Sequence, residues 1–447
     1  MQLKVLGSCP GYNKSDIGPV GILVKTDSGV TILVDCGMGH AGNPDVGYKP
    51  ITFLPLEIER LDYLLLTHIH IDHSGLVPWA MQKYPQAELV TTGPTLALGS
   101  AVWSDHERLA SRYGYPGLVP FNEVFYKEMR ERTICVTKPD WYHLRNDIRV
   151  YFNSNGHSRG SAYIVLEADG KRVVFSGDVS LDDMPTISGM REANIPPEIR
   201  GADILFLEST YGARAIKPRP EAIAAMNKAI VAALRHGGKV LATALSVERT
   251  QDIALDQVRA GISPVYIDGA LAASVWEIYQ RSEGYWSAND VLLELNEVQR
   301  VKCLLDYGNG FRAKMLDSKL SYSIVASPGS LQGGYSAAWA KRILPDPRSL
   351  LLQCGYQFEG TPGAELERFG SGMLLELDGE SVAVNSRVMR VDVSAHADRY
   401  QLAEVANWFS PKEVVLYHGA RSARERLREL LETDGLTVRI PFNNDII

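Results

Sequence analysis

The stretch Thr67-His68-Ile69-His70-Ile71-Asp72-His73-Ser74-Gly75 follows directly after the apolar run Tyr63-Leu64-Leu65-Leu66. The apolar run predicts a buried strand, so side chains that bind metals lie at its carboxyl end and in the turn beyond it. Side chains two residues apart in an extended segment point the same way, so His68 and His70 are expected to converge on one ion. The turn is expected to direct Asp72 and His73 towards a second ion. The alternative is a polar loop that is rich in histidine by chance.

Further candidate side chains follow other predicted strands. Asp35 comes after a strand at residues 30–34, which forms a hairpin with residues 21–25. Such an aspartate commonly caps a helix or turn, but beside this motif it is a candidate to orient a ligand through a hydrogen bond. His157 follows a strand at 148–152 and is a candidate third ligand for the first ion. Asp178 follows a strand at 173–176 and is well placed to bridge two cations.

In their order and at these strand ends, Asp35, the His68–His73 cluster, His157 and Asp178 resemble the motifs of metallo-β-lactamase-fold hydrolases. The resemblance implies a four-layer αββα sandwich with a two-zinc site along one edge. It covers residues 1–208 and a C-terminal return of the chain.

After residue 208, short apolar strands alternate with helices. Strands are expected at 240–243, 265–267, 324–326 and 350–352, and an amphipathic helix at 220–236. Strand and helix in alternation predict a parallel sheet, and hence an inserted α/β domain of roughly 180 residues. The expected division is residues 1–208, 209–390 for the insertion, and 391–447 for the return to the first domain.

The insertion resembles the β-CASP domain of nucleic-acid-processing metallo-β-lactamase proteins. The likeness rests on several motifs: Glu208-Ser209-Thr210-Tyr211-Gly212, Ser246-Val247-Glu248-Arg249-Thr250-Gln251, Asp268-Gly269-Ala270-Leu271-Ala272, Gly355 to Gly363, Val393-Ser394-Ala395-His396-Ala397-Asp398 and Leu416-Tyr417-His418-Gly419. By position, Glu208 corresponds to the acid of the family's motif A, His396 to the histidine of motif B and His418 to that of motif C. From the residues alone, His418 ends one more apolar strand, at 414–417, and would supply a further ligand to the second ion.

The resemblance implies two zinc ions and a division of roles. His68, His70 and His157 would hold one ion, and Asp72, His73 and His418 the other, with Asp178 between them. Asp35 would orient a ligand. His396, held by Glu208, would donate the proton to the leaving oxygen, and Asp72 would serve catalysis as well as metal binding.

The implied function is that of a zinc-dependent ribonuclease acting on RNA phosphodiester bonds, most simply in single-stranded RNA. The alternatives are a β-CASP DNA nuclease, in which motif C is typically apolar, a small-molecule hydrolase, which needs neither Glu208 nor His396, and a scaffold that has lost ligands. The mode of cleavage, internal or from the 5′ end, stays open. Residues 327–334 are either a phosphate cradle or simply a strand-to-helix connection.

Four cationic residues lie just after motif A or near an expected strand end of the insertion: Arg214, Lys217, Arg219 and Arg249. We expect some of them, Arg214 and Arg249 in particular, to contact the RNA backbone, with a solvated basic face as the alternative.

The chain departs from the family pattern in several places. Residues 7–20 differ from the expected glycine-rich entry, Ser158-Arg159 replaces an apolar pair, Glu248 stands where glycine is common, and Ser330 stands where methionine is common. None of these departures removes a candidate ligand.

The composition sets broader limits. The 447 residues carry a formal charge of -7, which argues against indiscriminate binding to nucleic acid. Five scattered cysteines support neither a disulfide framework nor a zinc ribbon. Because no signal-type leader and no long apolar run is seen, we expect a cytoplasmic protein without membrane contact. The oligomeric state stays open, with a homodimer among the alternatives.

Overall fold

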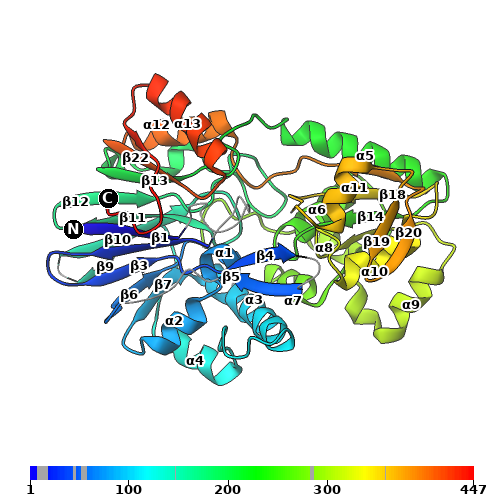
Figure 1. The fold of residues 1–447 in the computed structure, drawn as a ribbon, viewed down its shortest axis with the longest axis horizontal. Helices are drawn as coiled ribbons and strands as arrows, with labels where there is room; N and C mark the ends of the chain where they lie inside the picture. The colour runs from blue at the N-terminus through cyan, green and yellow to red at the C-terminus, as the bar shows by residue number, and fades with distance from the viewer. Residues whose placement is uncertain (8–18, 44–46, 52–57, 146, 282–285, 358) are drawn as a thin grey trace.

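A computed structural model describes residues 1–7, 19–43, 47–51, 58–145, 147–281, 286–357 and 359–447. Two sheets lie face to face in one half of the molecule, and a third sheet with its helices forms the other half (Figure 1). The segment 7–20, which differs in sequence from the family's glycine-rich entry, lies largely outside the described part of the chain, because residues 8–18 are not described.

The first sheet has six strands and is antiparallel at one edge and parallel from β3 onward. Its order is β1 (Gln2–Gly7), β2 (Gly21–Lys25), β3 (Thr31–Val34), β6 (Tyr63–Leu65), β7 (Glu88–Thr92) and β8 (Thr133–Val136). The predicted hairpin between β2 and β3 is confirmed by their antiparallel pairing. A separate two-stranded sheet joins β4 (Gly39–Asn43) and β5 (Gly47–Ile51).

The second sheet has seven strands and brings the end of the chain back to its first half. Its order is β23 (Val438–Arg439), β22 (Glu413–Tyr417), β13 (Ile204–Glu208), β12 (Lys171–Phe175), β11 (Ala162–Ala168), β10 (Ile148–Ser154) and β9 (Trp141–Arg145). The predicted return is confirmed, because β22 pairs in parallel with β13 more than 200 positions earlier in the chain, Glu208 opposite Tyr417.

Helices cover the outer face of each sheet and complete four layers (Figure 1). Apolar side chains of β1–β3 and β10–β12 form the core between the sheets. On the outside of the first sheet lie α2 (Val77–Lys83), α3 (Gly93–Arg112) and α4 (Glu123–Glu131), and on the outside of the second lie α12 (Arg399–Phe409) and α13 (Arg421–Thr433). The predicted αββα sandwich is therefore confirmed. Among the described helices, none is both long and apolar enough to cross a membrane.

The third sheet is wholly parallel and has six strands, as the strand and helix alternation predicts. Its order is β16 (Val301–Cys303), β15 (Val265–Asp268), β17 (Ser323–Ala326), β14 (Val240–Thr243), β18 (Leu350–Gln353) and β21 (Arg387–Arg390). Its helices are α5 (Arg219–Arg235), α6 (Arg249–Arg259), α7 (Ala270–Tyr279), α8 (Leu295–Arg300), α9 (Asn309–Asp317), α10 (Gly334–Ile343) and α11 (Pro362–Phe369). A hairpin of β19 (Leu374–Leu377) and β20 (Glu380–Ala383), which was not predicted, packs beside α11.

The two halves pack directly on each other. Helix α3 of the sandwich contacts α7 of the inserted part, and one apolar cluster continues from one half into the other. The boundaries at residues 208 and 390 stay a prediction.

Candidate metal centre

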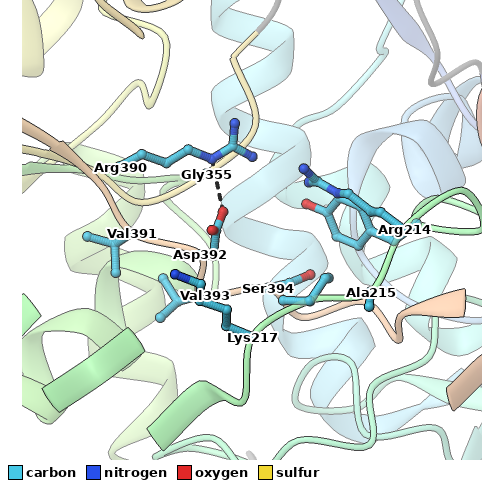
Figure 2. A pocket seen from close by; sticks show the side chains of 11 residues that line it. Arg214, Ala215, Lys217, Gly355, Arg390, Val391, Asp392, Val393 and Ser394 are labelled. Carbon is cyan, nitrogen blue, oxygen red and sulfur yellow. Dashed lines mark hydrogen bonds and ion pairs between the residues drawn. The ribbon is translucent and has the colours of Figure 1, made fainter. Parts of the chain in front are cut away.

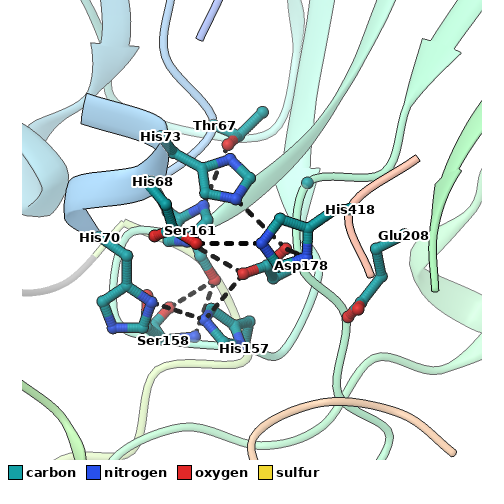
Figure 3. A network of polar contacts seen from close by, with 12 residues as sticks. Thr67, His68, His70, His73, His157, Ser158, Ser161, Asp178, Glu208 and His418 are labelled. Carbon is teal, nitrogen blue, oxygen red and sulfur yellow. Dashed lines mark hydrogen bonds and ion pairs between the residues drawn. The ribbon is translucent and has the colours of Figure 1, made fainter. Parts of the chain in front are cut away.

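Six chain segments deliver the candidate side chains to one edge of the sandwich. Asp35 follows β3, the histidine motif follows β6, His157 follows β10, Asp178 follows β12, Glu208 ends β13 and His418 follows β22. The two facing sheets bring these strand ends together, and Figure 3 shows the histidine side chains grouped around Asp178.

The motif itself is less extended than predicted. Strand β6 ends at Leu65, and the four-residue helix α1 (Ile71–Ser74) begins directly after His70. Asp72 and His73 therefore lie on a helical turn. This turn passes very close to Gly37, where an added Cβ would lie 1.6 Å from the carbonyl oxygen of Asp72. Only glycine fits at position 37.

Two candidate residues adopt left-handed backbone conformations that side chains other than glycine rarely take. Asp35 has a φ of 58° and His418 a φ of 50°. Such strain persists where surrounding structure holds it, and it is concentrated at functional sites. In both cases it lies where the chain leaves a strand and enters the centre.

On one side of the centre, His68, His70, His157 and Asp178 offer ligand atoms that all lie within 4.8 Å of one another. His157 Nδ1 lies 2.7 Å from the carbonyl oxygen of Ala395 and must donate to it, since a carbonyl only accepts. His157 Nε2 lies 2.9 Å from His70 Nδ1. Burial, followed by the neighbouring His396, lowers the pKa of His157 well below its usual value, and burial lowers that of His70 to about 3. Both rings are therefore neutral near pH 7, as metal binding requires.

Thr67 fixes the ring orientation of His68. The Thr67 hydroxyl donates to Asp35, with Oγ1 2.9 Å from Oδ2, and the His68 Nδ1 lies 3.0 Å from the same hydroxyl. Because the single hydroxyl proton is used on Asp35, His68 Nδ1 donates to Thr67. This leaves the His68 Nε2 lone pair directed into the centre.

On the other side, Asp72, His73 and His418 form a second group with ligand atoms within the same 4.8 Å. His73 Nδ1 lies 2.7 Å from Asp35 Oδ2, and His418 Nε2 lies 3.0 Å from Asp72 Oδ2. Thr210 Oγ1 lies 2.9 Å from His418 Nδ1. Against the effect of burial, the hydrogen bond from His418 lowers the pKa of Asp72, so Asp72 is ionised.

Asp178 lies between the two groups. Its Oδ2 is 3.4 Å from His68 Nε2, and its Oδ1 is 3.4 Å from His73 Nε2. Although burial opposes ionisation, His418 and His73 lower the pKa of Asp178 well below its usual value. A carboxylate that reaches both groups can bridge two cations.

The centre fits a metal ion because it holds buried nitrogen and oxygen atoms without hydrogen-bond partners. Among the described residues, these buried and unpartnered atoms include the Nε2 atoms of His68, His70 and His73 and the Oδ1 of Asp178. Leaving buried polar atoms unpaired is costly, and clusters of them require a partner such as a cation. Imidazole and carboxylate donors of this kind suit zinc.

His396 and Glu208 lie beside Asp178, and the His396 ring is nearer to the His157 ring (centroids 4.7 Å apart) than to the His418 ring (6.1 Å). His396 Nδ1 is 3.0 Å from Glu208 Oε1 and 4.0 Å from Asp178 Oδ2. Glu208 is itself held by the backbone N–H groups of Val179 and Thr210. Burial lowers the pKa of His396, but the carboxylates of Glu208 and Asp178 outweigh it and raise the value to about 9. His396 is therefore held in one orientation and carries a proton at neutral pH.

The four cationic residues separate into two pairs. Arg214 and Lys217 are exposed and line a cavity near His396. Arg219 and Arg249 are buried, at 7% and 6% exposure, and face Asp256 and Asp252 respectively. Arg249 therefore lacks the solvent access that an RNA contact needs. The spacing of these residues in the sequence does not indicate which of them are buried.

Several residues that orient the ligands were not singled out from the sequence. Thr67 directly precedes the candidate ligand His68, and this adjacency was an available signal. Thr210 lies 208 positions from His418, so no comparable signal pointed to it. The carbonyl of Ala395 carries no side-chain signal at all. Residues 327–333 connect β17 to α10, which agrees with the expected strand-to-helix connection.

Three family models match successive parts of the chain. Residues 18–224 match the metallo-beta-lactamase superfamily, residues 252–366 match the Beta-Casp domain, and residues 381–441 match a Zn-dependent metallo-hydrolase RNA specificity domain.

Relatives align over most of the chain. A transcription termination factor FttA of Methanothermobacter thermautotrophicus is 30% identical over 87% of this chain, which spans 63% of that protein. An RNase J-like protein of Methanocaldococcus jannaschii is 28% identical over 94% of this chain and 92% of its own length. A ribonuclease of Thermus thermophilus is 28% identical over 92% of this chain and 93% of its own length.

Proposed function

Because this chain belongs to the metallo-β-lactamase superfamily and carries a β-CASP domain, we propose that it is a zinc-dependent ribonuclease with two metal ions. The observation that carries the proposal is the convergence of seven ligand-type side chains on one buried site with unpaired lone pairs. Two relatives of nearly equal length, named RNase J-like protein and ribonuclease, support RNA as the substrate, as does the RNA specificity match at residues 381–441.

In the proposal, His68, His70 and His157 would hold one zinc ion, and Asp72, His73 and His418 would hold the other. Asp178 would offer a carboxylate oxygen to each group. When bound, the two ions supply a nucleophile from water, whose pKa falls towards about 7, and neutralise charge on the phosphate during attack. Asp35, Thr67 and the carbonyl of Ala395 keep the imidazole rings in the orientation that directs a lone pair inward.

His396 is the proposed proton donor to the leaving oxygen. Its position beside Asp178 and its hydrogen bond to Glu208 suit this role, since a general acid must be both protonated and oriented. A nearby divalent cation would lower the pKa of His396 from about 9 towards neutrality, which would ease proton release.

The burial of the centre favours a single strand. His68, His73, His157 and His418 are at most 1% exposed, so a phosphate reaches them only by entering the recess. A flexible single strand can place one phosphate there, whereas an RNA duplex presents its backbone on a rigid surface.

Cleavage of end-labelled RNA, end-labelled DNA of the same sequence and a nitrophenyl phosphodiester by one zinc-loaded preparation tests the proposal. We expect cleavage of RNA, and loss of that cleavage in Asp178→Asn. Hydrolysis of the DNA or the small ester without RNA cleavage would contradict the proposal and favour the corresponding alternative.

A further inference from the structure

A cavity of about 180 Å³ lies next to His396, between motif A and the C-terminal end of the third sheet. Its walls come from two stretches: residues 211–217 on one side and residues 390–394 on the other, with Gly355 at the rim. Figure 2 shows the side chains of Arg390 and Arg214 on opposite sides of the cavity. The metal centre as described above uses none of the charged residues that line it.

The cavity shares its wall with His396. The Tyr211 ring packs edge-on against the His396 ring, with centroids 5.9 Å apart. The backbone N–H of His396 donates to Ser394 Oγ at 2.8 Å. The wall formed by residues 211–217 is also tied to the start of α12, since the Arg399 backbone N–H donates to the carbonyl of Arg214 at 3.2 Å. The cavity is therefore held in a fixed position relative to the proposed proton donor.

The cationic side chains around the cavity differ in whether a carboxylate already pairs with them. Arg390 forms ion pairs with Glu367 and, at 2.9 Å, with Asp392, so its charge is already balanced. The Arg214 guanidinium stacks over the Tyr211 ring at 4.4 Å, which orients it. Within the described part of the chain, no carboxylate forms an ion pair with Arg214 or Lys217. Two exposed positive charges are therefore free to bind an anion at this wall.

We propose that this cavity binds the nucleotide on the leaving-group side of the scissile phosphate, with Arg214 and Lys217 on the next backbone phosphate. The inference rests on the proposed ribonuclease function and names a subsite for it. If His396 protonates the leaving oxygen, the nucleotide attached to that oxygen lies beside His396, which is where the cavity is. Its volume is below the roughly 300–1,000 Å³ of pockets that enclose drug-sized ligands, so it suits one unit of a longer chain.

The test compares the double variant Arg214→Ala/Lys217→Ala with a matched control, Lys228→Ala/Arg235→Ala. The control also removes one lysine and one arginine, from exposed positions on α5 outside the cavity. Two substrates are cleaved by each zinc-loaded protein. One is a single-stranded oligoribonucleotide, and the other is the same RNA ending in a nitrophenyl leaving group in place of the leaving-side chain.

We expect the double variant to lower the ratio of kcat/KM for RNA to kcat/KM for the nitrophenyl substrate by on the order of 10-fold, because only RNA fills the cavity. Its salt dependence should flatten by about 1.4 in slope, the value for two phosphate contacts on a single strand. The control should keep the wild-type ratio, and the zinc content of both variants should match the wild type.

Two results have different meanings. If the wild type cleaves RNA but the double variant keeps its ratio and salt slope, the subsite is wrong while the ribonuclease function stands. If the wild type cleaves neither substrate, the proposed function itself fails, and the subsite fails with it.

Discussion

His396 allows proton transfer to be separated from metal binding at the level of one residue. It contacts Glu208 through Nδ1 and is assigned no metal ion. We expect His396→Ala to keep the zinc content of the wild type and to bind RNA normally. Its cleavage rate should fall on the order of 10²- to 10⁴-fold, the usual contribution of a positioned general acid.

A substrate with sulfur as the leaving atom provides the control for His396. A thiolate leaves with little protonation, so this substrate should recover much of the rate lost in His396→Ala. It should recover none in Asp72→Ala, which is expected to lose metal. Loss of zinc in His396→Ala, measured by mass spectrometry, would show that the histidine is a ligand instead.

Glu248 is the second residue at which the structure suggests a measurable effect. It has a φ of 69° and a ψ of -64°, and the backbone N–H of Arg249 donates to the carbonyl of Val247. Glu248 is therefore the central residue of a strained γ-turn. Burial and the neighbouring Asp252 carboxylate raise the pKa of Glu248 to about 8. The folded state therefore keeps a proton that the unfolded chain loses near pH 4.5.

Stability should consequently fall as pH rises from about 5 to 8, because only the unfolded state releases this proton easily. Glu248→Gln keeps the size and the hydrogen-bond acceptor but cannot titrate. Relative to this variant, the wild type should lose about 1.4 kcal/mol of unfolding free energy per pH unit in that window. Urea unfolding of both zinc-loaded proteins at several pH values measures the difference, and a constant difference would contradict the assignment.

Single residues were predictable where a motif combines residue type with a strand end. The seven proposed ligands, Glu208 and His396 come together in the structure as the motifs indicated. Arg249 was expected at the RNA and is buried against Asp252, because whether a side chain faces solvent depends on packing that local sequence does not encode.

At the scale of elements, the loop after β10 is tied to the inserted domain by Arg159. Its guanidinium is buried and donates to three backbone carbonyls: Thr186 at 3.1 Å, Tyr279 at 2.8 Å and Val291 at 2.6 Å. Its own N–H donates to Glu248 Oε1 at 3.0 Å. Two departures from the family pattern, Arg159 and Glu248, are thus in contact, and Arg159 lies two residues after His157 in the chain.

Replacing Arg159 should therefore weaken the junction of the two halves. Arg159→Ala leaves three buried carbonyls without this donor, and each unpaired buried group costs about 1–3 kcal/mol. We expect a loss on the order of 3 kcal/mol or more in urea unfolding of the zinc-loaded protein. Arg426→Ala, at an exposed arginine paired with Glu429, is the control and should change stability by less than about 1 kcal/mol. Equal effects of the two substitutions would contradict the role of Arg159.

Strands were predictable from the sequence where they consist of continuous apolar residues. Strands such as β6, β14 and β18 are continuous apolar runs and lie where expected. Strand β9 and the hairpin of β19 and β20 were missed because they are partly exposed and carry polar side chains. The turn of α1 was predicted as a turn but not as a helix, since four residues contain too little periodicity.

At the scale of the whole molecule, the pairing of β22 with β13 is what completes the centre. It carries His418 to Asp72, a separation of 346 positions along the chain, with Nε2 and Oδ2 3.0 Å apart. The second ligand group therefore requires the chain to return to the sandwich after the insertion. The return was predictable from the motif order, whereas the junction through Arg159 needed the structure.

The proposed function depends on two zinc ions in one centre, held by residues from both ends of the chain. Anomalous diffraction at the zinc absorption edge from crystals of the zinc-loaded protein would locate these ions. We expect two peaks, one bonded to His68, His70 and His157 and the other to Asp72, His73 and His418, with Asp178 contacting both. A single peak, with His418 bonded to no metal, would contradict it.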